Sequence, residues 1–212
     1  MHLSSLPANI AADHLQANST AGRALYTGHT RLWQGPSVLE ADSIELLRAT
    51  RVMNAVGSVR GVFQQAQSGS AANKKPGLWH VSSGTLSYWD RESRAHLEKN
   101  VVVQSDDQRM RGPVLDLFFT CSADGAATSQ ISRAVGTGGV IVEQGDRRGT
   151  AETGVYTAKD EKFVLSGGKP TLFDPEEGTT SGRELTFFLV DDTIVVDSGN
   201  GSRTLTKHRV QR

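Results

Sequence analysis

The side chains that could do chemistry are few and scattered along the chain. None of the histidines has the H-x-x-x-H or H-E-x-x-H spacing that places two imidazoles on one metal ion; they are His2, His14, His29, His80, His96 and His208. The single cysteine, Cys121, excludes an internal disulfide and a multi-thiolate metal site. A small buried or loop thiol is a commoner role for such a cysteine than a nucleophile. We therefore expect neither a metal nor a cofactor.

Three pairs of adjacent acidic residues could suggest general acid–base catalysis: Asp106-Asp107, Glu176-Glu177 and Asp191-Asp192. Adjacent residues in a strand face opposite sides, and all three pairs fall where turns are expected. The glycine-rich segment 136–139 lacks the G-K-[ST] ending of a phosphate loop, and no serine lies in a G-x-S-x-G elbow. We identify no catalytic residue and expect that the protein is not an enzyme.

The composition indicates a thin core and many turns. The 212 residues are 37% hydrophobic and 6% aromatic, and the 22 glycines are about a tenth of the chain, above the roughly 7% average. Because 23 basic residues balance 23 acidic ones, no overall field attracts nucleic acid or an anionic membrane. No run approaches the 18 apolar residues of a transmembrane helix. Residues 1–13 do not resemble a secretory signal, so we expect a cytoplasmic protein or one whose leader or anchor lies outside this sequence.

The elements that would position these side chains are predicted to be short strands, because apolar and polar residues alternate with a period of two. Residues 22–35 and 54–63 are the clearest runs. A helix competes over 39–57, which is rich in Leu, Glu, Ala and Arg and ends at Gly57, a suitable C-cap. The equivalent block 112–119 contains glycine, proline and a β-branched residue, which fit a helix poorly. Strands are therefore predicted throughout.

A repeated spacing organises the chain. Each block has a small residue, then an apolar or small residue three places on, then an apolar residue two further on; the blocks start at Ala12, Ala41, Ser83, Gly112, Ala151 and Gly182. Successive starts are 29, 42, 29, 39 and 31 residues apart, and without the loops in the two longest intervals the period is about 30 residues. Such a period is typical of stacked units that bury their apolar faces against each other, so we expect a long, twisted sandwich or jelly roll.

Two segments interrupt the repeat. Residues 66–77 and 121–132 are polar and rich in small side chains, and we expect mobile loops at both places. We expect residues 11–207 to form a single domain, with 1–10 as a lead-in and 208–212 as a tail.

The block spacing and the alternating strands that follow resemble the OstA/LptA family of lipopolysaccharide-transport proteins. The resemblance covers about residues 10 to 207 and lies in residues 41–47 leading to 54–62, 82–88 leading to 95–105, and, most closely, 151–157, 163–174 and 182–188. It implies an all-β fold: an elongated, twisted, half-open antiparallel β-jellyroll built from stacked repeats. It also implies an apolar interior that receives the acyl chains of lipid A.

Under this interpretation the inward-facing apolar side chains are the candidate lipid-binding residues. An acyl chain gains about 0.8 kcal/mol per methylene buried in a dry trough. The candidates are Leu15, Ile44, Leu46, Val59, Phe63, Leu86, Tyr88, Val101, Val103, Leu115, Leu117, Val140, Val142, Tyr156, Leu165, Leu172, Leu185 and Phe187. The alternative is a structural or interaction β-solenoid in which these side chains fill a closed core and bind no lipid.

The resemblance also implies partners. It places the protein in the periplasm, in a bridge of jellyrolls that passes lipopolysaccharide toward the outer membrane, and no nucleic acid is expected. An open strand edge can accept a strand from another jellyroll or from a second copy, and the first block and residues 183–196 are the candidate docking edges. Arg31, Arg60 and Lys169 are candidates to meet lipid phosphates near the groove mouth, although a solvated surface charge is the commoner role for each of them.

Overall fold

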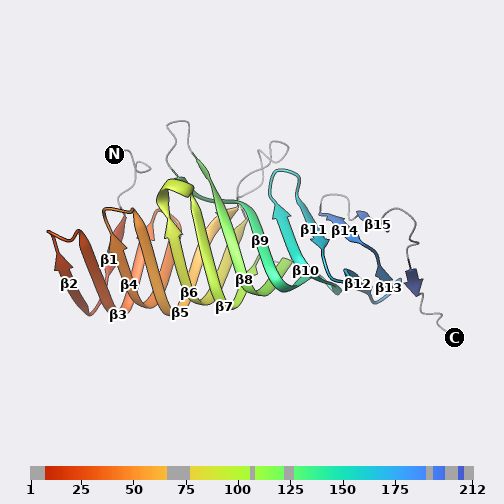
Figure 1. The fold of residues 1–212 in the computed structure, drawn as a ribbon, viewed down its shortest axis with the longest axis horizontal. Helices are drawn as coiled ribbons and strands as arrows, with labels where there is room; N and C mark the ends of the chain where they lie inside the picture. Colours follow the sequence, from red (N-terminus) through yellow and green to blue (C-terminus); the bar gives the residue numbers. More distant parts are fainter. Residues whose placement is uncertain are drawn as a thin grey trace.

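The computed structural model is an elongated stack of antiparallel strands that runs from the N-terminus to the C-terminus along its long axis (Figure 1). It describes residues 8–65, 77–105, 108–121, 127–189, 193–198 and 205–207. The elements of these residues are β1 (Asn9–Ala11), β2 (His14–Asn18), β3 (Arg23–Gln34), β4 (Ser37–Leu47), β5 (Val52–Gln65), β6 (Leu78–Trp89), η1 (Asp90–Glu92), β7 (Arg94–Gln104), β8 (Gln108–Cys121), β9 (Ala127–Gln144), β10 (Arg147–Thr157), β11 (Lys162–Ser166), β12 (Thr171–Asp174), β13 (Gly178–Ser181), β14 (Glu184–Phe188), β15 (Thr193–Asp197) and β16 (Leu205–Lys207). Within them no helix is long and apolar enough to cross a membrane.

The strands pair in chain order from β3 to β11, so neighbours in sequence are neighbours in space. At the N-terminal end, β1 and β2 both pair with β3, one with each half of it. At the C-terminal end, β12 and β11 share β10 in the same way. The sheet then divides into two arms, β11–β14–β15 and β12–β13–β16.

A line of register shifts crosses the long strands and bends the sheet into two layers. The shifts recur in each strand pair from β3–β4 to β9–β10. Pairs of residues with positive φ accompany them at Gly28-His29, Gly57-Ser58, Lys99-Asn100 and Gly138-Gly139. Since extra residues in one strand of a pair bend it and increase its twist, their alignment folds every long strand at the same height. We call the half that contains residues 43–47 layer A and the half that contains residues 37–40 layer B.

The small residues that open the predicted blocks lie at this bend. Ala41 lies beside the register shift of β4, and Gly182 lies between β13 and β14. A Cβ atom on Gly182 would lie 2.8 Å from the backbone oxygen of Asp197, so no larger side chain fits there. One repeat of about 30 residues is therefore one antiparallel strand pair, folded once.

The all-β prediction is confirmed, and the competing helix over 39–57 is absent because β4 and β5 occupy it. Two predicted boundaries change. Strand β1 begins at Asn9, inside the predicted lead-in, because it pairs with β3. Strand β9 begins at Ala127, inside the predicted second loop, because its first residues pair with β8. Residues 66–76, 122–126 and 208–212 lie outside the described residues, as do Asp106-Asp107 and Asp191-Asp192.

The core lies between the two layers. Strand register places one apolar row across the middle of the stack; in it lie Ile44, Ala55, Leu86, Leu97 and Leu115, none more than 2% exposed. A slip of one residue in any strand would turn its members of this row outward, so burial of the row fixes the register.

Candidate lipid-binding interior

An apolar cavity of about 520 Å³ lies between the layers in the N-terminal half of the stack. Its walls are Ala8, Ile10, Tyr26, Leu32, Gln34, Ser37, Val38, Leu39, Leu46, Met53, Phe63, Leu86, Tyr88, Asp90, Ala95 and Phe119. The volume is in the range of about 300–1,000 Å³ found for small-molecule sites, which are likewise mostly apolar with a few polar groups. One of the polar groups, the Ser37 hydroxyl, is buried and has no hydrogen-bond partner within the described part of the protein.

Three aromatic rings and a strand pairing end the cavity toward the middle of the stack. Phe63 of layer B meets Phe119 of layer A edge-on with ring centroids 5.5 Å apart, and Tyr88 meets Phe119 at 5.8 Å. Beside them the end of β5 pairs in parallel with β9, Gln64 with Gln130. This pairing joins the free ends of the two layers and closes the mouth between them at that point.

Beyond this closure the interior is filled. Trp79 and Tyr156 meet edge-on at 5.2 Å, and Phe163 lies 4.9 Å from Tyr156. These rings leave no space between them that could hold a water molecule. The backbone is also crowded here, since a Cβ on Gly154 would lie 2.9 Å from a methyl group of Val140. The C-terminal half therefore has a packed core where the N-terminal half has a cavity.

The predicted lipid-binding residues all lie on the inner face by strand register, but only four line the cavity: Leu46, Phe63, Leu86 and Tyr88. Most of the others are buried in the packed interior: Ile44, Val59, Val101, Val103, Leu115, Leu117, Val140, Val142, Tyr156, Leu165, Leu172, Leu185 and Phe187. Leu15 pairs with Tyr26 on the same face but is 58% exposed, because β2 ends the stack. Contact of these residues with lipid stays a prediction.

Several cavity residues were missed. Tyr26 and Leu32 lie in the alternating run of 22–35, and Phe119 continues the alternation of Leu115 and Leu117, so period-two counting could have found them. Ile10 fell in the segment interpreted as a lead-in, and no sequence signal showed that it faces the cavity.

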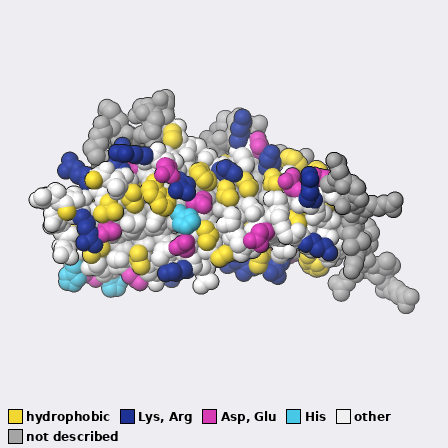
Figure 2. Space-filling view, in the orientation of Figure 1, with side chains coloured by type: hydrophobic (Ala, Val, Ile, Leu, Met, Phe, Trp, Pro, Cys, Tyr) yellow, Lys and Arg dark blue, Asp and Glu magenta, His cyan; other side chains and the backbone are white. Residues whose placement is uncertain are grey.

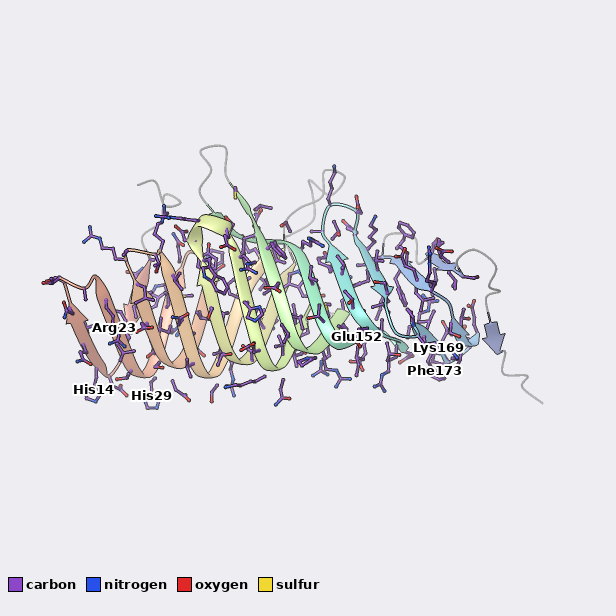
Figure 3. The ribbon with its side chains drawn as sticks, viewed as in Figure 1. His14, Arg23, His29, Glu152, Lys169 and Phe173 are labelled. Atoms are coloured by element: carbon purple, nitrogen blue, oxygen red, sulfur yellow. The ribbon has the colours of Figure 1, made fainter. Side chains whose placement is uncertain are left out.

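The three predicted phosphate-binding cations do not lie at the mouth, and this prediction is wrong. Arg31 pairs with Glu40 at 3.7 Å on the outer face of layer B, where Arg60 is the register partner of Glu40. Their side chains alternate with the inward residues of the same strands and so point away from the interior. Lys169 lies at the bend, along the lower edge in Figure 3, on the side opposite the mouth.

Cationic side chains do occur at the mouth, on the turns of layer A. A second hollow of about 510 Å³ lies there, and it shares Leu46, Met53, Tyr88 and Asp90 with the cavity. Arg48 and Arg51 line it from the turn, whereas Arg23, which also lines it, is held in an ion pair with Glu45 on the outer face of layer A. Figure 2 shows Lys and Arg side chains at the upper left, over the N-terminal strands and next to exposed apolar side chains. Together the two hollows offer an apolar space with guanidinium groups at its opening.

The remaining polar groups form structural pairs. In the described part of the chain no three His, Cys, Asp or Glu side chains lie close enough to hold a metal ion. Cys121 is exposed, and its thiol lies 3.2 Å from the Ser93 hydroxyl. His96 lies 3.0 Å from Asp116 on the outer face of layer A. Glu176-Glu177 forms a turn that the Asp174 carboxylate caps through their backbone N–H groups.

A folded stack of antiparallel strands around an apolar interior defines a β-jellyroll. The family model of the LptA/(LptD N-terminal domain) LPS transport protein matches residues 9–120 and again residues 80–193. The chain belongs to this family of lipopolysaccharide-transport proteins.

Among solved structures, the chain is similar to LptH, the LptA homologous periplasmic component of the conserved lipopolysaccharide transport device from Pseudomonas aeruginosa. The identity is 19%, the TM-score is 0.45, and the match covers 59% of this chain and 92% of that chain. A comparison with curated proteins finds no match.

Proposed function

We propose that this protein binds lipopolysaccharide by taking acyl chains of lipid A into the cavity of its N-terminal half, and carries it across the periplasm toward the outer membrane. The observation that supports this is the cavity of about 520 Å³ with apolar walls on both layers. Each methylene that enters contributes about 0.8 kcal/mol, so such a wall can hold an acyl chain without a catalytic or metal group.

We further propose that residues 11–207 act as one domain whose ends dock other jellyrolls. Among the described strands, β1 and β2 pair with β3 alone, and Leu15 leaves an apolar side chain exposed at this N-terminal end. At the other end β15 carries Val195, which is 50% exposed. A partner strand could add to either edge, either from a related jellyroll or from a second copy in head-to-tail order.

A closed structural core remains the second candidate, and it is favoured for the C-terminal half. There Trp79, Tyr156 and Phe163 fill the interior, and an acyl chain could enter only by displacing them. Lipid binding is thus favoured for the N-terminal half and a closed core for the C-terminal half, and a test must compare the two halves.

Two tyrosines provide that comparison. Tyr26 lies in the cavity wall and Tyr156 lies in the packed half. In the test, each tyrosine is replaced separately by a photo-reactive phenylalanine analogue of similar shape. Illumination in cells that make lipopolysaccharide is expected to give lipopolysaccharide adducts from position 26 and none from position 156, read by immunoblotting.

The outcomes separate the candidates. No adduct from position 26 in a folded, expressed variant would reject the lipid-binding function and favour the closed core. Equal adducts from both positions would contradict confinement of the lipid to the N-terminal half. The outward-facing Val56, 50% exposed, is the background control.

A further inference from the structure

The turns at the mouth of the cavity present two arginines and one aspartate toward its opening. Arg48 and Arg51 flank the turn between β4 and β5, and Asp90 begins η1 after β6. We call these three residues the arginine rim. Resting on the proposed function, we propose that the rim binds a phosphate group of the lipid whose acyl chains occupy the cavity.

The backbone holds the rim in place. The Arg48 N–H donates to the Gly22 oxygen at 2.8 Å, and the Asp90 N–H donates to the Arg51 oxygen at 3.2 Å. These bonds continue the strand ladder beyond Leu46, Met53 and Tyr88, so the rim residues stand one step above the inward-facing row that lines the cavity. A headgroup at the rim and an acyl chain in the cavity would therefore be close enough to belong to the same lipid molecule.

The charges of the rim are suited to an anion that arrives with the lipid. Arg51 forms an ion pair with Asp90, whose side chain is 22% exposed, and the Arg48 side chain has no ion pair with any described residue. A guanidinium group presents paired N–H donors that match phosphate oxygens as well as they match a carboxylate. In the structure the guanidinium group of Arg51 is paired with the Asp90 carboxylate. A bound phosphate would replace this carboxylate as the partner of Arg51 and would lie between Arg48 and Arg51.

Tyr88 connects the rim to the cavity. Its ring packs against Phe119 in the cavity wall, and Tyr88 and Asp90 both line the cavity and the second hollow. Burial, and then the charge of Asp90, raise the pKa of Tyr88 to about 12. The phenol is therefore neutral in any physiological medium and remains a hydrogen-bond donor to an anion.

Opposite substitutions at one ion pair test the rim. The affinity of the full-length protein is measured for bis-phosphorylated lipid A, for its dephosphorylated form, and for a neutral fluorescent hydrocarbon probe. Arg51→Gln with Arg48→Gln is expected to weaken binding of the phosphorylated lipid about tenfold and to leave the other two ligands unchanged. Asp90→Asn is expected to tighten binding of the phosphorylated lipid about threefold, because it frees Arg51.

Each outcome decides between explanations. If Asp90→Asn and the double variant both bind all three ligands more weakly, the rim residues have a structural role, and the proposal that they bind phosphate is overturned. Unchanged affinity of the double variant for phosphorylated lipid A would also overturn it while leaving the cavity intact. Inorganic phosphate at the same concentration should not displace the lipid, and displacement would assign the site to free phosphate instead. If wild-type protein binds neither lipid nor probe, the proposed function itself fails.

Discussion

Asp174 shows how much a single buried charge depends on its partners in this fold. Its side chain is 7% exposed and accepts hydrogen bonds from the Arg147 guanidinium at 2.6 Å and from the backbone N–H groups of Glu176 and Glu177. The bond from Arg147, followed by the one from Glu177, holds the pKa of this carboxyl below its usual value of 3.8. A buried carboxylate without these donors would be costly, so the turn after β12 and the start of β10 are held together here.

We expect Asp174→Asn to lower the free energy of unfolding at pH 7 by about 2 kcal/mol, because it removes a charged acceptor from three donors. The folded-state pKa lies below the unfolded one, so this stabilisation is fully present above about pH 4 and is lost as the pH falls through the folded-state value. Urea unfolding at pH 7 and pH 3 measures the difference between wild type and variant at each pH.

An exposed pair supplies the control for this prediction. Asp197→Asn breaks the 2.8 Å ion pair between Asp197 and Arg183, in which the aspartate side chain is 50% exposed and the arginine side chain 70% exposed. It should change the free energy of unfolding by less than about 0.5 kcal/mol. A cost at Asp174 that is no larger than at Asp197, or that does not shrink at pH 3, would contradict the role given to the buried carboxylate.

At the scale of elements, the bend depends on residues with positive φ. Gly57 has a φ of 82°, and a Cβ there would collide with the carboxylate of Asp42 on the neighbouring strand. Gly139 has a φ of 96°, and no atom of the described residues lies within 4 Å of such a Cβ. Both glycines thus need a positive φ, but an added Cβ would meet a neighbouring side chain at Gly57 and would not at Gly139.

Gly57→Ala is expected to cost more stability than Gly139→Ala. Positive φ alone costs about 1–2 kcal/mol for a residue with a Cβ, and both variants bear that cost. The extra cost of Gly57→Ala should become smaller when Asp42→Ala is added, because the carboxylate is removed while the Cβ of residue 42 remains at 2.9 Å, and a double-mutant cycle by thermal or urea unfolding would show this. Equal costs for the two glycine variants would mean that Asp42 does not constrain the bend.

The strands and their faces could be predicted from the sequence, whereas the bend and the cavity could not. Alternation over 54–63 correctly places Ala55 and Val59 inside, because these two residues lie an even number of positions apart across the bend of β5. The small first residue of each block lies at the bend, but the residue pairs with positive φ have no consistent signature, since Lys99-Asn100 adopts positive φ without glycine. The cavity depends on rings that meet across the layers, such as Phe63 and Phe119, and such a distant contact leaves no local pattern.

At the scale of the whole molecule, the two family matches are offset by two repeats. They begin at residues 9 and 80, which are 71 apart, and the blocks at Ala12 and Ser83 are also 71 apart. The family model therefore matches the chain at two places whose starts differ by two blocks of the repeat. A stack built in this way ends in strand edges at both extremities, which is the geometry that strand addition requires.

Leu15 provides a test of docking at the N-terminal edge. If a second copy adds there, Leu15→Arg should shift the monomer–oligomer equilibrium toward monomer, because it places a charge in an apolar contact. Sedimentation velocity over a range of protein concentrations measures this shift. Val56→Arg, a change at a similarly exposed residue on the outer face, should have no effect. A wild-type protein that stays monomeric at high concentration would count against head-to-tail docking.

The parallel pairing of β5 with β9 has a consequence for the path of any molecule along the stack. Strands β5 to β9 pair in sequence, and the β5–β9 pair returns to the start, so these five strands form a small closed barrel between two open sheets. Its lumen is occupied by side chains such as Trp79 and Met110. The β5–β9 contact is two residue pairs long, and strands β5 to β8 also supply part of the cavity wall. The cavity is therefore separated from the C-terminal arms by the packed rings of Trp79, Tyr156 and Phe163, which a molecule moving along the stack would have to displace.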